Sequence, residues 1–258
     1  MTAVALPAEQ AGAGGGAGSA LHPAWSVQAR RSARAVGVFF LLATAAGVVH
    51  LALAGPVLGG EDLLADVAAG RTRLLVGVLA VLVMAAAVVG VSVAAYPVLR
   101  LRSPGLALGY VAARTAEAVF FGVGAVLLIG LVVLADAVTA SSAGDAALLA
   151  DALLGMREWG AATVINTAVF PVGALIFYGL LYRGRLVPGW LAAWGFAGAV
   201  PYLVSGLLLA LDRIEAVSPA MALLNLPLAV NELVVATWLI AKGYEPAALA
   251  ALEDRRTA

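Results

Sequence analysis

The stretch LALGYVAARTAEAVFFGVGAVLLIGLVVLAD, residues Leu106–Asp136, decides the fold of this chain. Its charged residues are Arg114 and Glu117 in the interior and Asp136 at the end. A helix needs about 20 mainly apolar residues to cross the hydrocarbon core of a bilayer. This run is longer than that, so we expect a membrane-spanning helix that carries two charges inside the membrane.

The composition of the whole chain agrees with a membrane protein. Of its 258 residues 63% are hydrophobic and 12% are charged, and the mean hydropathy is +1.02. Soluble domains are about 45–50% apolar and about 25% charged. The 15 basic and 15 acidic residues balance, so there is no basic surface that would indicate nucleic acid as a partner. Cysteine is absent, which excludes disulfides, thiolate metal sites and thiol nucleophiles.

The hydropathy pattern predicts an all-α fold, a polytopic integral membrane bundle of six transmembrane helices. These lie at about Ala35–Leu58, Leu74–Val98, Leu106–Asp136, Gly160–Tyr182, Trp190–Leu211 and Pro219–Ala241. The membrane domain is accordingly residues 30–245. The stretch AGAGGGAGSA (Ala11–Ala20) is of low complexity, and we expect residues 1–29 to be a disordered tail. Residues 246–258 are expected to form a short polar C-terminal tail.

Basic residues concentrate on one side of the predicted bundle. Ten lie on the side of the termini, for example Arg30, Arg31 and Arg34, whereas four lie on the opposite side. Basic residues favour cytoplasmic loops, so both termini are expected to be cytoplasmic. The longest outer connection, residues 137–159, contains DAALLADALLGMREW, which predicts a short interfacial helix. A helix packed over the bundle is favoured over a lid.

The depth of the buried charges predicts which of them are partners. Arg114 in the third span and Glu232 in the sixth each lie about ten residues from the cytoplasmic end, or ~15 Å deep. Glu117 lies one helical turn from Arg114 on the same face. Arginine can donate to several carboxylates at once. We therefore expect a buried Glu117–Arg114–Glu232 cluster that ties the third span to the sixth.

Two interpretations of this cluster stay open. With both Glu ionised it carries a surplus negative charge, which favours one carboxyl holding a proton and is typical of a substrate, ion or proton site. Buried ion pairs can also merely fix which helices pack together. Asn231 should face another direction, toward a different helix. His50 in the first span should reach the level of Glu117 and complete the candidate set as a packing residue or a relay.

Motifs of known catalytic chemistry are absent from the sequence. It contains no HExxH, GxSxG, Walker or GxGxxG motif. Only two histidines are present, and His22 lies in the predicted tail. No catalytic residue, metal site or cofactor is predicted, and an enzyme is less favoured than a non-enzyme.

Several motifs together carry a resemblance to a known family. They are ARAVG (Ala33–Gly37), Arg73, ARTAEA (Ala113–Ala118), LVPGWL (Leu186–Leu191) and the long segment from Pro227 through Asn231-Glu232 and Trp238 to Lys242-Gly243-Tyr244. In this pattern the chain resembles the domain-of-unknown-function 4386 family of bacterial multi-pass membrane proteins, with Tyr244 where the family usually has Phe. The resemblance covers residues 30 to 245 and implies a bacterial inner-membrane location, but it brings no activity.

Three function classes remain. The first is a small transporter or proton-coupled permease with Arg114, Glu117 and Glu232 at its centre. The second is a non-enzymatic scaffold or sensor in which the cluster only locks the third and sixth helices. The third, less favoured, is an enzyme that acts on lipid. The lipid bilayer is the one expected partner, while a small-molecule or ion ligand and a homo-oligomer stay open.

Overall fold

The computed structural model describes residues 23–138, 143–215 and 218–257. Within these residues the chain is helical and contains no strand, as predicted. Six helical stretches are long and apolar enough to cross a membrane, which confirms the predicted multi-pass bundle. They are Trp25–Leu58, Arg71–Arg102, Pro104–Ala137, Gly144–Gly184, Gly189–Ala210 and Pro219–Ala241.

The spans correspond to long, nearly uninterrupted helices. The first three are α1 (Pro23–Leu58), α3 (Arg71–Arg102) and α4 (Pro104–Ala137), with the short α2 (Leu63–Ala69) between the first two. The fourth is a rod of α5 (Ala143–Gly155), η1 (Met156–Ala161), α6 (Ala162–Val164), η2 (Ile165–Val169) and α7 (Phe170–Gly184). The chain ends with α8 (Gly189–Ala210), α9 (Pro219–Ala241) and α10 (Pro246–Thr257).

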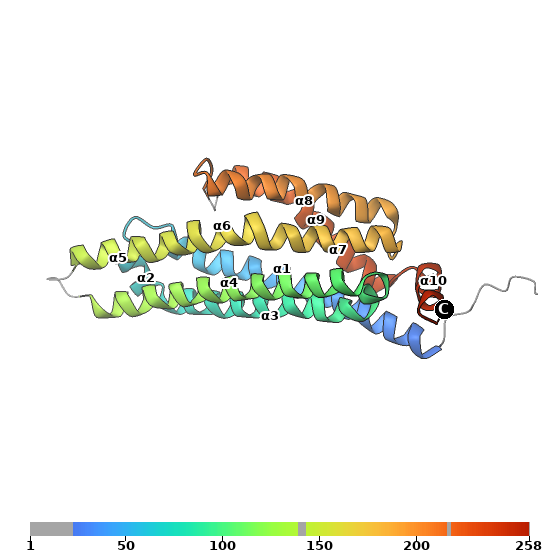
Figure 1. Ribbon diagram of the computed structural model, residues 1–258. Helices are drawn as coiled ribbons and strands as arrows, with labels where there is room; N and C mark the ends of the chain where they lie inside the picture. Colours follow the sequence, from blue (N-terminus) through green and yellow to red (C-terminus); the bar gives the residue numbers. More distant parts are fainter. Residues whose placement is uncertain (1–22, 139–142, 216–217, 258) are drawn as a thin grey trace, which may run out of the picture.

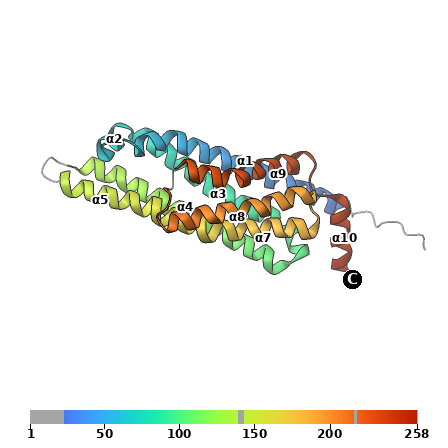
Figure 2. The same ribbon diagram turned by 90° about the horizontal axis from the view of Figure 1, so that it is seen from above.

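The six spans close into a ring in the order of the chain. α1 packs on α3, α3 on α4, α4 on α7, α7 on α8 and α8 on α9, and α9 returns to pack on α1. Figures 1 and 2 show this bundle from two directions at a right angle. In such a ring α4 lies opposite α9, and α1 lies opposite α7, so side chains from these four helices can meet on the central axis.

The two ends of the ring differ in construction. α8 and α9 have 22 and 23 residues, whereas α3 and α4 have 32 and 34. The far ends of α4 and of the rod, together with α2, therefore extend beyond the connection between α8 and α9 (Figure 1). At the other end, α10 lies beside the beginning of α1, which places the two ends of the described chain on the same side of the bundle (Figure 1).

Three sequence predictions about the flanking segments need correction. α1 already begins at Pro23, within the predicted tail, while residues 1–22 lie outside the described residues. The predicted polar C-terminal tail contains the helix α10. Residues 143–159 belong to the rod and continue the fourth span, so the expected separate interfacial helix over the bundle is wrong. Residues 139–142 lie outside the described residues.

Pro171 explains why the rod contains a wider turn just before α7. Proline lacks the N–H that an α-helix needs, and its ring collides with the carbonyl four residues earlier. Here the π-helical turn η2 ends at Val169 and Pro171 follows in the first turn of α7. The rod accommodates the proline by widening, and π turns of this kind often lie at functional sites.

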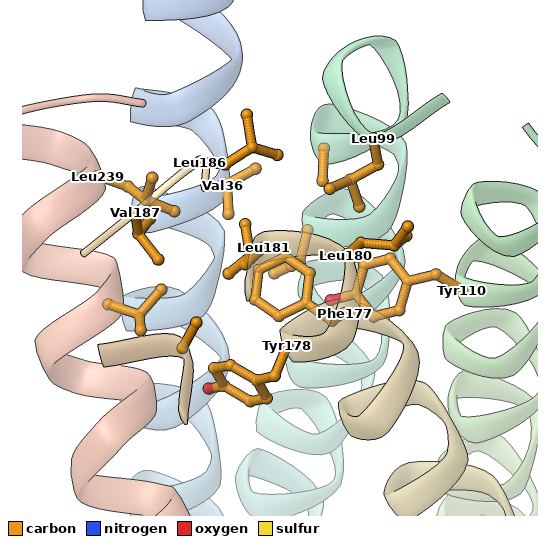
Figure 3. Close-up of a cluster of buried hydrophobic side chains, with 14 of the residues drawn as sticks. Val36, Leu99, Tyr110, Phe177, Tyr178, Leu180, Leu181, Leu186, Val187 and Leu239 are labelled. Carbon is orange, nitrogen blue, oxygen red and sulfur yellow. The ribbon is translucent and has the colours of Figure 1, made fainter. Parts of the chain in front are cut away.

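The end of the ring nearest α10 holds the main hydrophobic core. Phe177 of α7 packs on Tyr110 of α4 with ring centroids 5.0 Å apart, and on Phe40 of α1 at 5.7 Å. Tyr178 follows at 5.3 Å from Phe177 in an edge-on arrangement. Figure 3 shows Phe177 between Tyr110 and Tyr178, surrounded by aliphatic side chains. Aromatic side chains thus fill the central axis of the helix bundle at this end.

Gly206 generates a first testable prediction. A Cβ at this position of α8 would lie 2.4 Å from the carbonyl oxygen of Asn166 in η2, which is backbone and cannot move aside easily. We expect Gly206→Ala to lower the free energy of unfolding by roughly 1–3 kcal/mol through overpacking. Thermal unfolding of the detergent-purified protein measures the effect.

Gly179→Ala is the matched control, because nothing lies within 4 Å of a Cβ at that helical position. There, alanine should leave stability unchanged or raise it by up to about 1 kcal/mol. Equal unfolding temperatures for the two variants would contradict the close approach of α8 to the rod.

Candidate functional site

Arg114 projects from α4 toward the axis of the ring and is 2% exposed. Its Nη1 donates to Oε2 of Glu117 at 2.8 Å, and its Nη2 donates to Oε1 of Glu232 on α9 at 3.4 Å. Its Nε donates to the hydroxyl of Tyr110 at 3.3 Å. The structure therefore brings together the three charged residues singled out from the sequence, and all three nitrogens of the guanidinium group have a partner.

Aromatic rings from three helices enclose this guanidinium group. Its central carbon lies 4.9 Å from the ring centroid of Phe170, 5.5 Å from that of Tyr110 and 5.8 Å from that of Phe40. A cation close to ring faces is stabilised by their negative electrostatic potential, and more so where water is excluded. The sequence analysis did not identify Phe40 or Phe170, because an aromatic residue in a span is equally typical of ordinary core packing.

The two carboxylates differ in their surroundings. The side chains of Arg114 and Glu117 are both 3% exposed, whereas that of Glu232 is 16% exposed. The contact from Arg114 to Glu232 is also longer than that to Glu117. Glu117 is thus the more buried carboxylate and has the shorter contact with Arg114. Glu232 has the longer contact and is the more accessible carboxylate of the cluster.

Asn231 points away from the cluster, as expected from its place beside Glu232. Its Nδ2 donates to the carbonyl oxygen of Leu191 at 3.0 Å, which links α9 to α8. The Asn231 side chain is fully buried, and its Oδ1 has no hydrogen-bond partner in the part of the chain that the structure describes. Asn231 therefore fixes the orientation of α9 on α8, next to the point where Glu232 meets Arg114.

His50 lies apart from the Arg114 cluster and has a different partner. Its Nδ1 is 3.0 Å from the carbonyl oxygen of Gly77, and its Nε2 is 2.9 Å from Nη2 of Arg157. Because a carbonyl can only accept, Nδ1 carries the proton and Nε2 accepts from the arginine. This assigns a neutral imidazole in one tautomer. The sequence placed Arg157 in an outer loop, and the pair became visible only once the rod was known to continue through η1.

The His50–Arg157 pair lines a cavity of about 200 Å³ on the side of the ring away from α10. Phe120 and Phe121 of α4 form part of its wall, and they follow Glu117 by one helical turn. Arg157 also lies 3.6 Å from the carboxylate of Glu158, through its Nη1. The cavity therefore holds an oriented cation within a turn or so of the Arg114 cluster.

Comparison with protein families matches residues 35–243 to the family described as "Domain of unknown function (DUF4386)". The chain belongs to this family. The matched region contains all of α3, α4, α8 and α9, and with them Arg114, Glu117 and Glu232. Comparisons with curated proteins and with solved structures gave no match. The family description assigns no activity to the Arg114 cluster.

The cluster yields a prediction about stability. Arg114→Met removes the cation and leaves Glu117 buried without a partner, which we expect to cost about 3–5 kcal/mol of folding free energy. Adding Glu117→Gln and Glu232→Gln to this variant should restore much of the loss, because no buried charge then remains. Thermal unfolding and the yield of monodisperse protein in detergent measure both variants.

Glu232→Gln alone serves as the control, since Arg114 keeps its shorter ion pair with Glu117. This variant should be much milder than Arg114→Met. An Arg114→Met protein that accumulates and melts like the parent would refute the electrostatic coupling of α4 and α9.

Proposed function

We propose that this DUF4386 member is a small transporter, a proton-coupled permease, in which Glu232 takes up and releases the proton. The observation that carries the proposal is the link between Arg114 and Glu232 across the centre of the ring. α4 packs on α3 and α7, and α9 packs on α8 and α1. The two charged side chains therefore join opposite walls of the ring along its axis, where a substrate route would run.

Charge balance supports a proton at this link. One arginine between two carboxylates leaves a surplus negative charge at about the middle of the membrane, and a charge at that depth is costly. A proton on one carboxyl removes the surplus. Glu232 is the better candidate, because it is more exposed and more weakly bound than Glu117. Protonation would weaken its contact with Arg114 and release α9 from α4.

The surroundings of the cluster support movement. The cavity beside His50 and Arg157 approaches the cluster from the side away from α10. The π turn η2 lies directly before Phe170, which stacks on Arg114. π turns within α-helices often mark functional sites. A small shift of the rod at η2 would therefore move the Phe170 side chain that covers Arg114.

The alternative with independent support is a scaffold or sensor. The aromatic enclosure and the full pairing of Arg114 favour it, because a dry, satisfied ion cluster can serve only to fix which helices pack together. The enzyme class has less support. An enzyme with a serine nucleophile would need a histidine beside it. Ser205 of α8 donates to Asn225 at 2.7 Å, and His50 contacts the carbonyl of Gly77, so these two described residues do not form a Ser–His pair.

We further propose a bacterial inner-membrane location with both termini in the cytoplasm. The support is the excess of basic residues on the side of the ring where α1 begins and α10 ends. The side that carries α2 and the extended ends of α4 and α5 would then face the periplasm.

Transport is tested with purified protein in liposomes that contain a pH-sensitive dye. Small organic acids, amines and sugars are added outside, one class at a time. We expect at least one class to change the internal pH with the parent protein. Glu232→Gln should abolish this proton movement, because its side chain cannot titrate. Thr237→Val on the same helix is the control that keeps the charges.

Cysteine labelling separates the permease from the scaffold, because the natural chain contains no cysteine. Val235→Cys places a thiol one turn from Glu232, at a position that is fully buried. In a permease, a charged, membrane-impermeant thiol reagent should reach and modify it, and Glu232→Gln should change how the labelling rate depends on pH beyond the ordinary ionisation of a thiol. A thiol that stays unreactive at every pH, with no proton movement for any compound class, would sink the permease proposal and leave the scaffold.

A further inference from the structure

A second charged cavity lies at the opposite end of the ring from the Arg157 cavity, where α1 begins and α9 passes into α10. Its volume is about 320 Å³. Four basic side chains line it: Arg30, Arg31 and Arg34 from α1, and Lys242 from the end of α9. No acidic residue is among its lining residues.

The fold brings these four cations together in two steps. α1 is already helical before Arg30, so Arg30 and Arg34 lie one turn apart on the same face, with Ala29 and Ala33 buried beside them. At the other wall, Gly243 adopts a φ of 79°, in the region that favours glycine. This residue lets the chain turn from α9 into α10 and leaves Lys242 beside α1.

The four basic side chains have no carboxylate partner among the residues that the structure describes. Like charges one turn apart on a helix repel one another. Four exposed cations around one cavity, with no carboxylate among its lining residues, attract anions, and an anion with several acceptor oxygens can accept from more than one of them.

The walls of the cavity identify the source of that anion. Val27, Pro246 and Leu249 are among the lining residues, so apolar surface lies next to the charged groups. Val38 is 53% exposed one turn beyond Arg34, where the apolar part of the first span begins. The cavity thus lies at the boundary between polar headgroups and acyl chains. Basic pockets between membrane helices at this depth suit anionic lipid headgroups.

We propose that the cavity formed by Arg30, Arg31, Arg34 and Lys242 binds the phosphate headgroup of an anionic phospholipid. The arginines donate to the phosphate oxygens, and the apolar wall contacts the glycerol and the upper acyl chain. Such a lipid would join the start of α1 to the connection between α9 and α10. The site is independent of the Arg114 cluster and of the transport proposal.

The test measures lipid binding by native mass spectrometry of the full-length protein, with phosphatidylglycerol, phosphatidylcholine and inorganic phosphate as probes. We expect phosphatidylglycerol to bind and the other two to bind at least about tenfold more weakly. Arg34→Gln with Lys242→Gln should lower phosphatidylglycerol affinity about tenfold or more. Arg34→Lys, which keeps the charge, should lose less.

Arg183→Gln with Arg185→Gln is the matched control. These two arginines lie at the same end of the helix ring, and the double substitution removes the same amount of positive charge. They line another cavity, whose lining includes Glu245. Thermal unfolding without added lipid checks that all variants are folded. An equal loss of affinity in the control pair would mean general surface attraction and overturn the site. Binding of inorganic phosphate as tight as that of the lipid would overturn the lipid as its source.

Discussion

The positive charge of Arg114 at the centre of the membrane is the constraint on which the rest of the structure depends. Arginine keeps its proton in proteins, so this side chain must be paired wherever the fold places it. Glu117 satisfies it from the same helix, and Glu232 reaches it from the opposite wall of the ring. Closure of the six helices into a ring is what makes the second contact geometrically accessible.

Close helix approaches allow the ring to close. A Cβ at Gly37 of α1 would lie 2.5 Å from the carbonyl oxygen of Ala236 on α9, so only glycine permits that contact. Gly206 has the same role between α8 and the rod. Without a hydrophobic force between helices in lipid, such small-residue contacts are what hold membrane helices together. The sequence contains too many small residues to single out these two in advance.

Hydropathy and the position of charged residues within each span predict some features of this structure and not others. Hydropathy defines the six spans, and counting residues from the ends of α4 and α9 predicts that Arg114 and Glu232 lie at the same depth. The role of Arg157 was not predicted, because the charges at positions 157 and 158 suggested a loop. In the structure the helix continues there as a π turn, and His50 accepts a hydrogen bond from the arginine. The start of α1 was not predicted because residues 23–29 directly follow the low-complexity stretch Ala11–Ala20 and were assigned to the same tail. The helix α10 was not predicted because its polar end resembles a solvated tail in composition. The cavity with four cations could not be predicted until both helices were known.

The central claim is that Glu232, and not Glu117, exchanges a proton at the ring centre. Infrared difference spectroscopy between acidic and alkaline pH observes the carbonyl stretch of a protonated carboxyl group directly. The account predicts one such band from the buried cluster, which disappears in Glu232→Gln. In Glu117→Gln the band persists but forms only at more acidic pH, because Arg114 then faces a single carboxylate and the surplus negative charge is gone. A band that persists in Glu232→Gln, or the absence of any pH-dependent carboxyl band, would contradict it.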